Sequence, residues 1–208
     1  MKLNLPNKLT VMRLCLVPVL LIVGMLPTSI LPFYVSCVIC ALLFIGTAIT
    51  DMLDGRIARK RNLITDFGKF LDPIADKVMV IGALFVLLHK FPSLELPLIV
   101  TLIVVVFREL AVTSMRLVVS TGSGVVVAAN NLGKIKTVSQ IVAIATVFLE
   151  PVLQLVIRLS FEALSGKCAA WRDLPVLSWL TLAFSVVMTV WSGLNYILAL
   201  WGHLDPEK

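Results

Sequence analysis

The sequence predicts an all-α fold, a six-helix bundle that crosses a membrane. Two features of the composition support this prediction. Hydrophobic residues make up 59% of the 208 residues and charged residues only 14%, whereas an average soluble domain is about half apolar and about a quarter charged. Apolar content this high, combined with so few charges, is typical of polytopic membrane proteins. The apolar residues are also grouped into long runs, and these runs indicate the helices.

Six apolar runs are each long enough to cross about 30 Å of hydrocarbon as a helix, at about 1.5 Å per residue. Backbone groups in lipid must be hydrogen-bonded within the protein, and runs this long and uniform exclude the strands of a barrel. The predicted spans are residues 9–27, 31–52, 72–90, 96–119, 137–161 and 173–201. Residues 1–208 are therefore expected to form a single membrane domain, with no room for a separate soluble one.

Short segments with turn-forming residues separate most of these spans. Residues 25–29 and 89–93 each contain a proline and join neighbouring spans closely. Residues 120–133 contain three glycines and two adjacent asparagines, which predicts a hinge-like connection before the fifth span. Residues 166–175 join the fifth and sixth spans. The connection between the second and third spans differs from these, because it carries a dense group of charged residues.

Positive charges predict how the bundle is oriented in the membrane. The formal net charge is +6, but the cations flank apolar segments instead of forming a solvated arm, which argues against nucleic-acid binding. One side of the bundle carries Lys2, Lys8, Arg13, Arg56, Arg59, Lys60, Arg61, Lys69, Lys134 and Lys136, and the other carries Lys90, Arg158, Lys167 and Arg172. Because flanking cations favour the cytoplasmic side, we expect a protein of the cytoplasmic (inner) membrane with both termini in the cytoplasm.

Two pairs of aspartates flank the charged connection. Asp51 and Asp54 are three residues apart, which separates them by about 60° around a helix, and Asp72 and Asp76 are four apart, about 40°. Each pair therefore shares one helix face. The connection is short, so the two helices are expected to be antiparallel neighbours. Four carboxylates can then converge near the cytoplasmic interface, and we place the active site at that end of the bundle.

Such a group of carboxylates favours a metal site. Charges beside lipid are costly and are usually functional, and oxygen-rich sites suit hard divalent cations such as Mg²⁺ or Mn²⁺. Two ions about 4 Å apart would clamp the attacking and leaving oxygens of a phosphoryl transfer. The alternative is a solvated interfacial cluster in which the aspartates pair with Arg56, Arg59 and Lys69.

The spacing of this segment resembles that of a known family. Eight positions over residues 51–76 match the signature of the CDP-alcohol phosphatidyltransferases, namely Asp51, Asp54, Gly55, Ala58, Arg59, Gly68, Asp72 and Asp76. The resemblance implies a six-span fold and a site for two metal ions. It also implies that an alcohol attacks the lipid-side phosphate of a CDP-lipid, that CMP leaves, and that the protein is a homodimer.

Roles for individual residues follow from the same resemblance. Asp51, Asp54, Asp72 and Asp76 correspond to the metal ligands, and Asp76 also resembles the general base that takes the alcohol proton. Gly55 corresponds to a position where the backbone approaches the nucleotide without a Cβ in the way. The remaining positions expected to contact the CDP-lipid are Asn7, Thr10, Arg59, Thr65 and Gly68.

The acceptor alcohol is predicted from cations outside the signature. Arg108 and Arg116 lie about 80° apart on a helix and could face one cavity. Lys134 and Lys136 open the fifth span, where a helix N-terminus adds to a phosphate site. These four cations together favour an acceptor that carries its own phosphate. These positions also resemble the branch of the family that uses CDP-diacylglycerol and glycerol 3-phosphate as substrates.

Two alternatives stay open at this point. The same chemistry could serve another acceptor, such as inositol phosphate, serine or a second lipid, because cations also suit inositol phosphate. A protein of a different class, a cation-coupled transporter, could use the carboxylates to bind its ion. Transporters usually place such sites at the bilayer midplane between repeats, whereas these carboxylates flank one connection and no repeat is visible.

Overall fold

The computed structural model confirms the all-α prediction. It describes residues 5–60, 66–122, 131–165 and 174–201, and within these ranges it contains helices and no strand. A short 3₁₀ helix, η1, spans Pro92–Leu94. The α-helices are α1 (Leu5–Met25), α2 (Phe33–Lys60), α3 (Asp66–Lys90), α4 (Glu95–Gly122), α5 (Asn131–Ser165) and α6 (Val176–Trp201).

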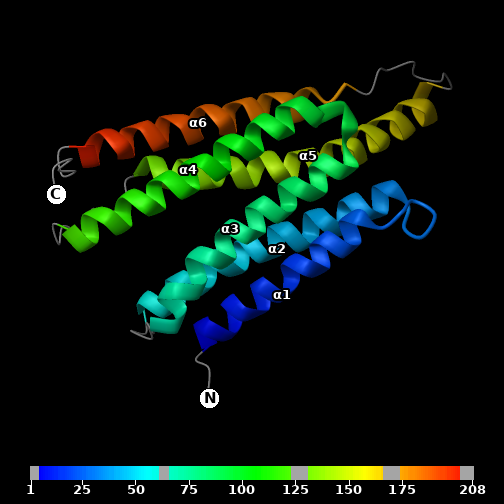
Figure 1. The fold of residues 1–208 in the computed structure, drawn as a ribbon. Coiled ribbons are helices and arrows are strands. Elements are labelled where there is room, and N and C mark those ends of the chain that lie inside the picture. Colours follow the sequence, from blue (N-terminus) through cyan, green and yellow to red (C-terminus); the bar gives the residue numbers. More distant parts are fainter. Residues whose placement is uncertain (1–4, 61–65, 123–130, 166–173, 202–208) are drawn as a thin grey trace.

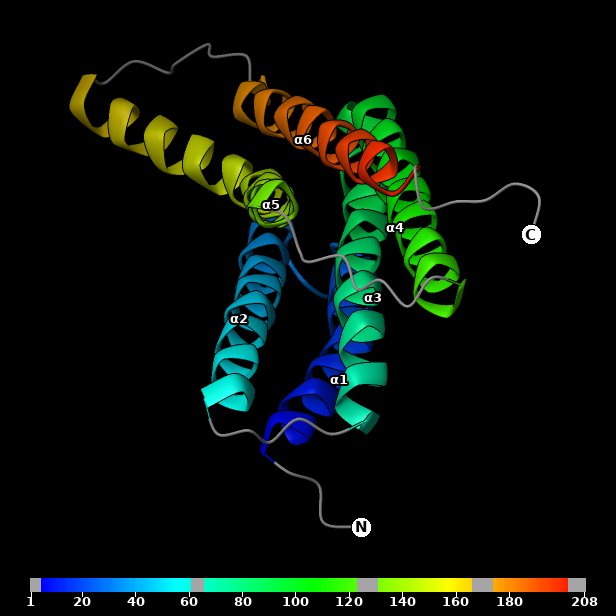
Figure 2. The same ribbon diagram turned by 90° about the vertical axis from the view of Figure 1, so that its left-hand side faces the viewer.

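The helices run up and down, so alternate connections lie at the same end of the bundle (Figure 1). α1, α3 and α5 begin at the end where α2, α4 and α6 finish, and we call this the motif end. The bundle has two parts: α1, α2 and α3 pack together, and α4, α5 and α6 form a second group (Figure 2). Contacts of α3 with α4 and of α2 with α5 join the two parts.

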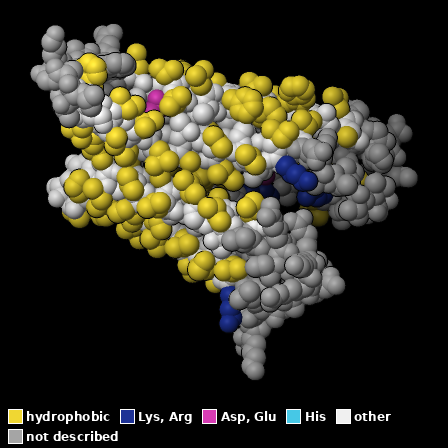
Figure 3. Space-filling model, turned by 180° about the vertical axis from the view of Figure 1, so that it is seen from behind, with side chains coloured by type: hydrophobic (Ala, Val, Ile, Leu, Met, Phe, Trp, Pro, Cys, Tyr) yellow, Lys and Arg dark blue, Asp and Glu magenta, His cyan; other side chains and the backbone are white. Residues whose placement is uncertain are grey.

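Five helices in the described part of the chain are long and apolar enough to cross a membrane, namely α1, α2, α4, α5 and α6. Side chains on the outer surface are mostly hydrophobic, and the Lys and Arg visible on the face in Figure 3 lie toward one end. α3 differs because charged residues occupy its first half, among them Asp72, Asp76 and Lys77. The structure therefore supports an integral membrane protein. Five of its described helices qualify as membrane spans by their length and composition.

Close helix packing creates the core of the first part of the bundle. Phe44 of α2 and Leu84 and Leu87 of α3 are fully buried against one another and their neighbours. α1 approaches α3 so closely at Gly24 that a Cβ there would lie 2.2 Å from Val86 Cγ1. Small residues allow such approaches between membrane helices. The backbones of α1 and α3 are thus fixed relative to each other along their length.

Glu150 explains how α6 begins. This carboxylate of α5 is buried and accepts hydrogen bonds from the backbone N–H groups of Leu177 (2.9 Å) and Ser178 (2.7 Å), and from the Ser178 hydroxyl. The first N–H groups of a helix have no partner within it, and a negative charge is favourable there. Glu150 therefore caps α6 from the neighbouring helix, at the end opposite the motif end.

The structure corrects the expected relation between the two helices that carry the aspartates. α2 and α3 are antiparallel, but they touch each other little, because α1 packs against both of them. Both helices also extend beyond the apolar runs into the charged connection, α2 to Lys60 and α3 back to Asp66. Asp51, Asp72 and Asp76 therefore lie on regular helix, with α1 packed between the two helices that carry them.

Candidate active site

Arg13 of α1 joins carboxylates from the other two helices. Its Nη1 lies 2.5 Å from Asp51 Oδ1 of α2 and donates to Asp76 Oδ1 of α3 at 2.7 Å. The guanidinium is only 1% exposed, whereas the side chains of Asp51 and Asp76 are 39% and 50% exposed. Burying a guanidinium is costly unless charges compensate it. The two carboxylates supply that compensation and remain open to the solvent side.

Thr10 holds the third described aspartate. Its hydroxyl donates to Asp72 Oδ1 at 2.6 Å, one turn of α1 before Arg13. Thr10 and Asn7 are both buried, on the same helix as Arg13. The start of α1, predicted to border the CDP-lipid, thus lies directly against the aspartates.

The donor chemistry of this cluster suits a divalent cation. Carboxylate oxygens from α2 and α3 already converge on one nitrogen of Arg13, and hard cations prefer such oxygens. Among the described residues, however, no three His, Cys, Asp or Glu side chains could hold a metal ion in their present arrangement. The guanidinium stands where the carboxylates converge, and the side chain of Asp54 lies outside the described part.

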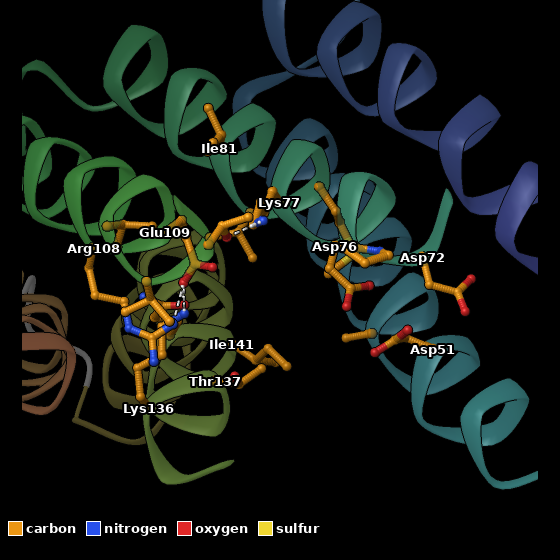
Figure 4. Close-up of a pocket in the computed structure, with 18 of the residues that line it drawn as sticks. Asp51, Asp72, Asp76, Lys77, Ile81, Arg108, Glu109, Lys136, Thr137 and Ile141 are labelled. Carbon is orange, nitrogen blue, oxygen red and sulfur yellow. Dashed lines mark hydrogen bonds and ion pairs between the residues drawn. The ribbon is translucent and has the colours of Figure 1, made fainter. Parts of the chain in front are cut away.

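A cavity of about 350 Å³ opens beside the aspartates, a size typical of small-ligand sites. Asp51, Asp72 and Asp76 line one end of it (Figure 4). Arg108 and Lys136 line the other end, where Figure 4 shows their side chains gathered around Glu109. One continuous cavity therefore connects the carboxylates of α2 and α3 to the cations of α4 and α5.

Glu109 organises the cationic end of the cavity. Its Oε1 pairs with Arg108 Nη1 at 3.1 Å and also with Lys136 Nζ. Arg108 Nη2 donates to Ser192 of α6 at 3.1 Å, and its buried Nε has no partner in the described part of the chain. A single carboxylate thus positions two cations from different helices and leaves this group with net positive charge.

Arg116 reaches the same cavity two turns further along α4. Its Nε donates to the Tyr196 hydroxyl at 3.1 Å, and its guanidinium lies 5.6 Å from the centre of that ring. Arg108 and Arg116 therefore both line one cavity, as their spacing suggests. Lys134 lies elsewhere: it is exposed and lines an apolar groove between α5 and α6. Its assignment to the acceptor stays a prediction, without support from this cavity.

The other residues of the family signature are described less fully. Asp54, Gly55 and Arg59 belong to α2, but their side-chain surroundings lie outside the described part of the structure. Thr65 lies in the undescribed segment 61–65 altogether. Gly68 is buried near the start of α3. Their predicted contacts with a CDP-lipid remain predictions.

Three residues at this site, Arg13, Glu109 and Lys77, have no individual role in the prediction from sequence. Arg13 enters that prediction only among the cations that orient the bundle in the membrane. A signal for all three was present, because each is an ionisable residue within or beside an apolar run, where charge is costly and usually functional. What they contact depends on which helices are neighbours, and the sequence pattern does not show that.

Comparison with known proteins decides which family these residues belong to. The family model of the CDP-alcohol phosphatidyltransferases matches residues 3–191, which is most of the chain. The chain belongs to this family. The match includes the aspartates of α2 and α3, both arginines of α4 and the lysines that open α5. Family membership decides against the cation-coupled transporter.

Several proteins named as transferases of this family are similar to the chain, two of them over almost its whole length. A CDP-diacylglycerol–glycerol-3-phosphate 3-phosphatidyltransferase of Bacillus subtilis (strain 168) is 41% identical over 99% of both chains. A protein of the same name from Yersinia pestis is 30% identical over 98% of both chains. Another, from Wigglesworthia glossinidia brevipalpis, is 37% identical over 69% of this chain and 76% of its own.

Replacing Arg13 with methionine is expected to destabilise the protein, because Asp51 and Asp76 then lose the cation that they share. Hydrogen bonds to charged groups contribute about 1.5–3 kcal/mol each, and partial exposure of the aspartates reduces this, so a loss of about 1–3 kcal/mol is expected. The measurement is thermal unfolding in detergent with a chelator present. Arg13→Lys keeps the charge and should lose less. An Arg13→Met protein as stable as the unchanged protein would contradict the bridging role.

Proposed function

We propose that the protein transfers the phosphatidyl group of CDP-diacylglycerol to glycerol 3-phosphate, producing phosphatidylglycerophosphate and CMP. The observation that carries this proposal is the cavity that joins three carboxylates at one end to the cations of α4 and α5 at the other. The names of the relatives from Bacillus subtilis and Yersinia pestis state the same reaction for those proteins. The cavity favours an acceptor that carries a phosphate, and the names of the relatives point to glycerol 3-phosphate among such acceptors.

The cationic end suits an acceptor that carries its own phosphate. Arg108 and Lys136 share the single negative charge of Glu109, and the described partner of Arg116 is the neutral side chain of Tyr196. A phosphate dianion bound here would balance the remaining positive charge and accept hydrogen bonds from Arg108 and Arg116. A zwitterionic acceptor such as serine, which carries no net charge, or the apolar part of a second lipid, would leave the net positive charge of these cations uncompensated.

The carboxylate end suits the reacting groups. In the proposed reaction the primary hydroxyl of glycerol 3-phosphate transfers its proton to Asp76. Its oxygen then forms a bond to the lipid-linked phosphorus, and the bond from that phosphorus to the CMP oxygen breaks, so that CMP leaves with the electron pair. Asp76 is half exposed and lines the cavity, which leaves it accessible to an alcohol held at the cationic end.

Asp51, Asp54, Asp72 and Asp76 are proposed to hold two Mg²⁺ or Mn²⁺ ions. When bound, the ions would neutralise the diphosphate of the CDP-lipid and stabilise the charge of the leaving group. Thr10 holds Asp72 in place and Arg13 holds Asp51 and Asp76, so α1 orients the ligands. Asn7, Thr10, Gly55, Arg59, Thr65 and Gly68 are proposed to contact the CDP-lipid, and Lys134 to add charge near the acceptor site.

The placement in the membrane is also part of the proposal. We infer that α3 is a sixth span whose charged first half lies at the cytoplasmic interface, so that the motif end, both termini and the active site face the cytoplasm. Because the relatives are bacterial proteins, we propose the inner membrane as its location. We further propose that residues 1–208 form one domain and that the protein is a homodimer, as the family resemblance implies.

The proposed reaction predicts that CMP release by the detergent-purified protein requires CDP-diacylglycerol and glycerol 3-phosphate together. A chelator should abolish the release, and added Mg²⁺ or Mn²⁺ should restore it. The measurement is CMP release with a panel of acceptors that includes inositol phosphate and serine. Release with one of those acceptors but not with glycerol 3-phosphate would still support transfer of the phosphatidyl group, but it would contradict glycerol 3-phosphate as the acceptor.

Asp76→Asn is expected to lower kcat by at least about 100-fold, because an amide cannot take the alcohol proton. Binding of CDP-diacylglycerol should be largely kept, since the remaining aspartates still approach the diphosphate. The measurement combines steady-state CMP release with equilibrium binding of the CDP-lipid. A matched control is Gln140→Glu, which places a carboxylate elsewhere in the cavity and should not restore turnover in the Asp76→Asn protein. A near-normal rate for Asp76→Asn would contradict its role as base.

A further inference from the structure

Lys77 occupies the wall between the two ends of the cavity. It follows Asp76 directly on α3 and lines the same cavity as the aspartates and the cations of α4 and α5 (Figure 4). Its ammonium group donates to the hydroxyl of Thr113 on α4 at 2.8 Å, and Thr113 also lines the cavity. The side chain thus spans the gap between α3 and α4, and because this contact is exposed its ammonium group stays accessible to a ligand.

The charge of Lys77 has no acidic partner in the part of the chain that the structure describes. Its hydrogen-bond partner there is a neutral hydroxyl, whereas Arg13, Arg108 and Lys136 each pair with a carboxylate. An ammonium group that is paired only with a neutral hydroxyl keeps its capacity to bind an anion. The position of Lys77 in the cavity therefore points to a negatively charged ligand.

The helical geometry defines where that ligand lies. Neighbouring residues on a helix are about 100° apart around the axis and about 1.5 Å apart along it. Asp76 accordingly faces Arg13 of α1, while Lys77 faces Thr113 of α4 at nearly the same depth. An acceptor with its hydroxyl at Asp76 and its phosphate near Arg108 and Lys136 would pass directly alongside Lys77.

We propose that Lys77 binds the phosphate of the acceptor, with Thr113 as the residue that positions it. This inference rests on the proposed function and adds a fourth cation, on α3, to those of α4 and α5. A phosphate held from both sides would place the acceptor hydroxyl of a short three-carbon alcohol close to Asp76. The lysine would also separate the acceptor phosphate from the carboxylates, which otherwise repel it.

Steady-state CMP release with each substrate varied in turn tests this proposal. Lys77→Met should raise the KM for glycerol 3-phosphate about tenfold or more, and leave the KM for CDP-diacylglycerol within about twofold. Lys77→Arg should recover part of the loss because it keeps the charge. Thr113→Val should raise the same KM by a smaller factor. Protection of the protein by glycerol 3-phosphate against thermal unfolding should need correspondingly higher concentrations in Lys77→Met.

Lys90→Met is the matched control, because it removes a lysine from the opposite end of α3, where Lys90 donates to the Gly24 carbonyl. It should leave both KM values unchanged. An unchanged KM for glycerol 3-phosphate in Lys77→Met would overturn the proposal, as would a rise in the KM for CDP-diacylglycerol instead. If Lys77→Met does not fold, the KM values of Lys77→Arg and Thr113→Val for glycerol 3-phosphate test the proposal instead. Loss of glycerol 3-phosphate dependence in the unchanged protein would instead overturn the proposed function itself.

Discussion

The buried guanidinium of Arg13 is the constraint on which the arrangement of the site depends. It brings together Asp51 of α2 and Asp76 of α3, two helices that barely touch each other. Carboxylates confined near lipid repel one another unless a cation lies between them. α1 supplies that cation from within the protein and contributes Thr10 to Asp72 as well. The first helix is therefore part of the proposed active site as well as a helix apolar enough to cross the membrane.

Separation of charge across one cavity follows from this arrangement. α1, α2 and α3 contribute the carboxylate end, whereas α4, α5 and α6 contribute the cations and the side chains that hold them. Close packing supports both ends: a Cβ on Gly193 of α6 would lie 3.1 Å from Arg108 Cγ, so the glycine leaves room for the arginine. A nucleophile and a phosphate on the same small molecule can be bound at opposite ends of such a cavity.

Much of this architecture could be predicted from the sequence, because hydrophobic runs indicate membrane helices directly and the spacing of Asp72 and Asp76 indicates a shared helix face. The pairing of helices could not be predicted in the same way. The short connection between α2 and α3 suggested direct neighbours, but α1 packs between them. For the same reason the sequence did not show that Glu109 joins Arg108 to Lys136, or that Glu150 caps α6.

The two lysines at the start of α5 show most clearly what the sequence alone does not predict. Lys134 and Lys136 are equivalent as sequence signals for phosphate binding, yet two residues along a helix place side chains about 160° apart. Lys136 is buried against Glu109, and Lys134 is exposed beside α6. Only the position of α4 relative to α5 distinguishes them. Tertiary packing thus decides which charged residues of a helix belong to the site.

The central claim is that one cavity binds the reacting phosphate at its carboxylate end and the acceptor phosphate at its cationic end. A structure of the Asp76→Asn protein with CDP-diacylglycerol, Mg²⁺ and glycerol 3-phosphate would test it most directly. We expect the phosphate of glycerol 3-phosphate to lie against Arg108, Arg116 and Lys136, with its primary hydroxyl directed toward residue 76. An acceptor phosphate bound outside this cavity, for example beside Lys134 in the groove between α5 and α6, would contradict the account.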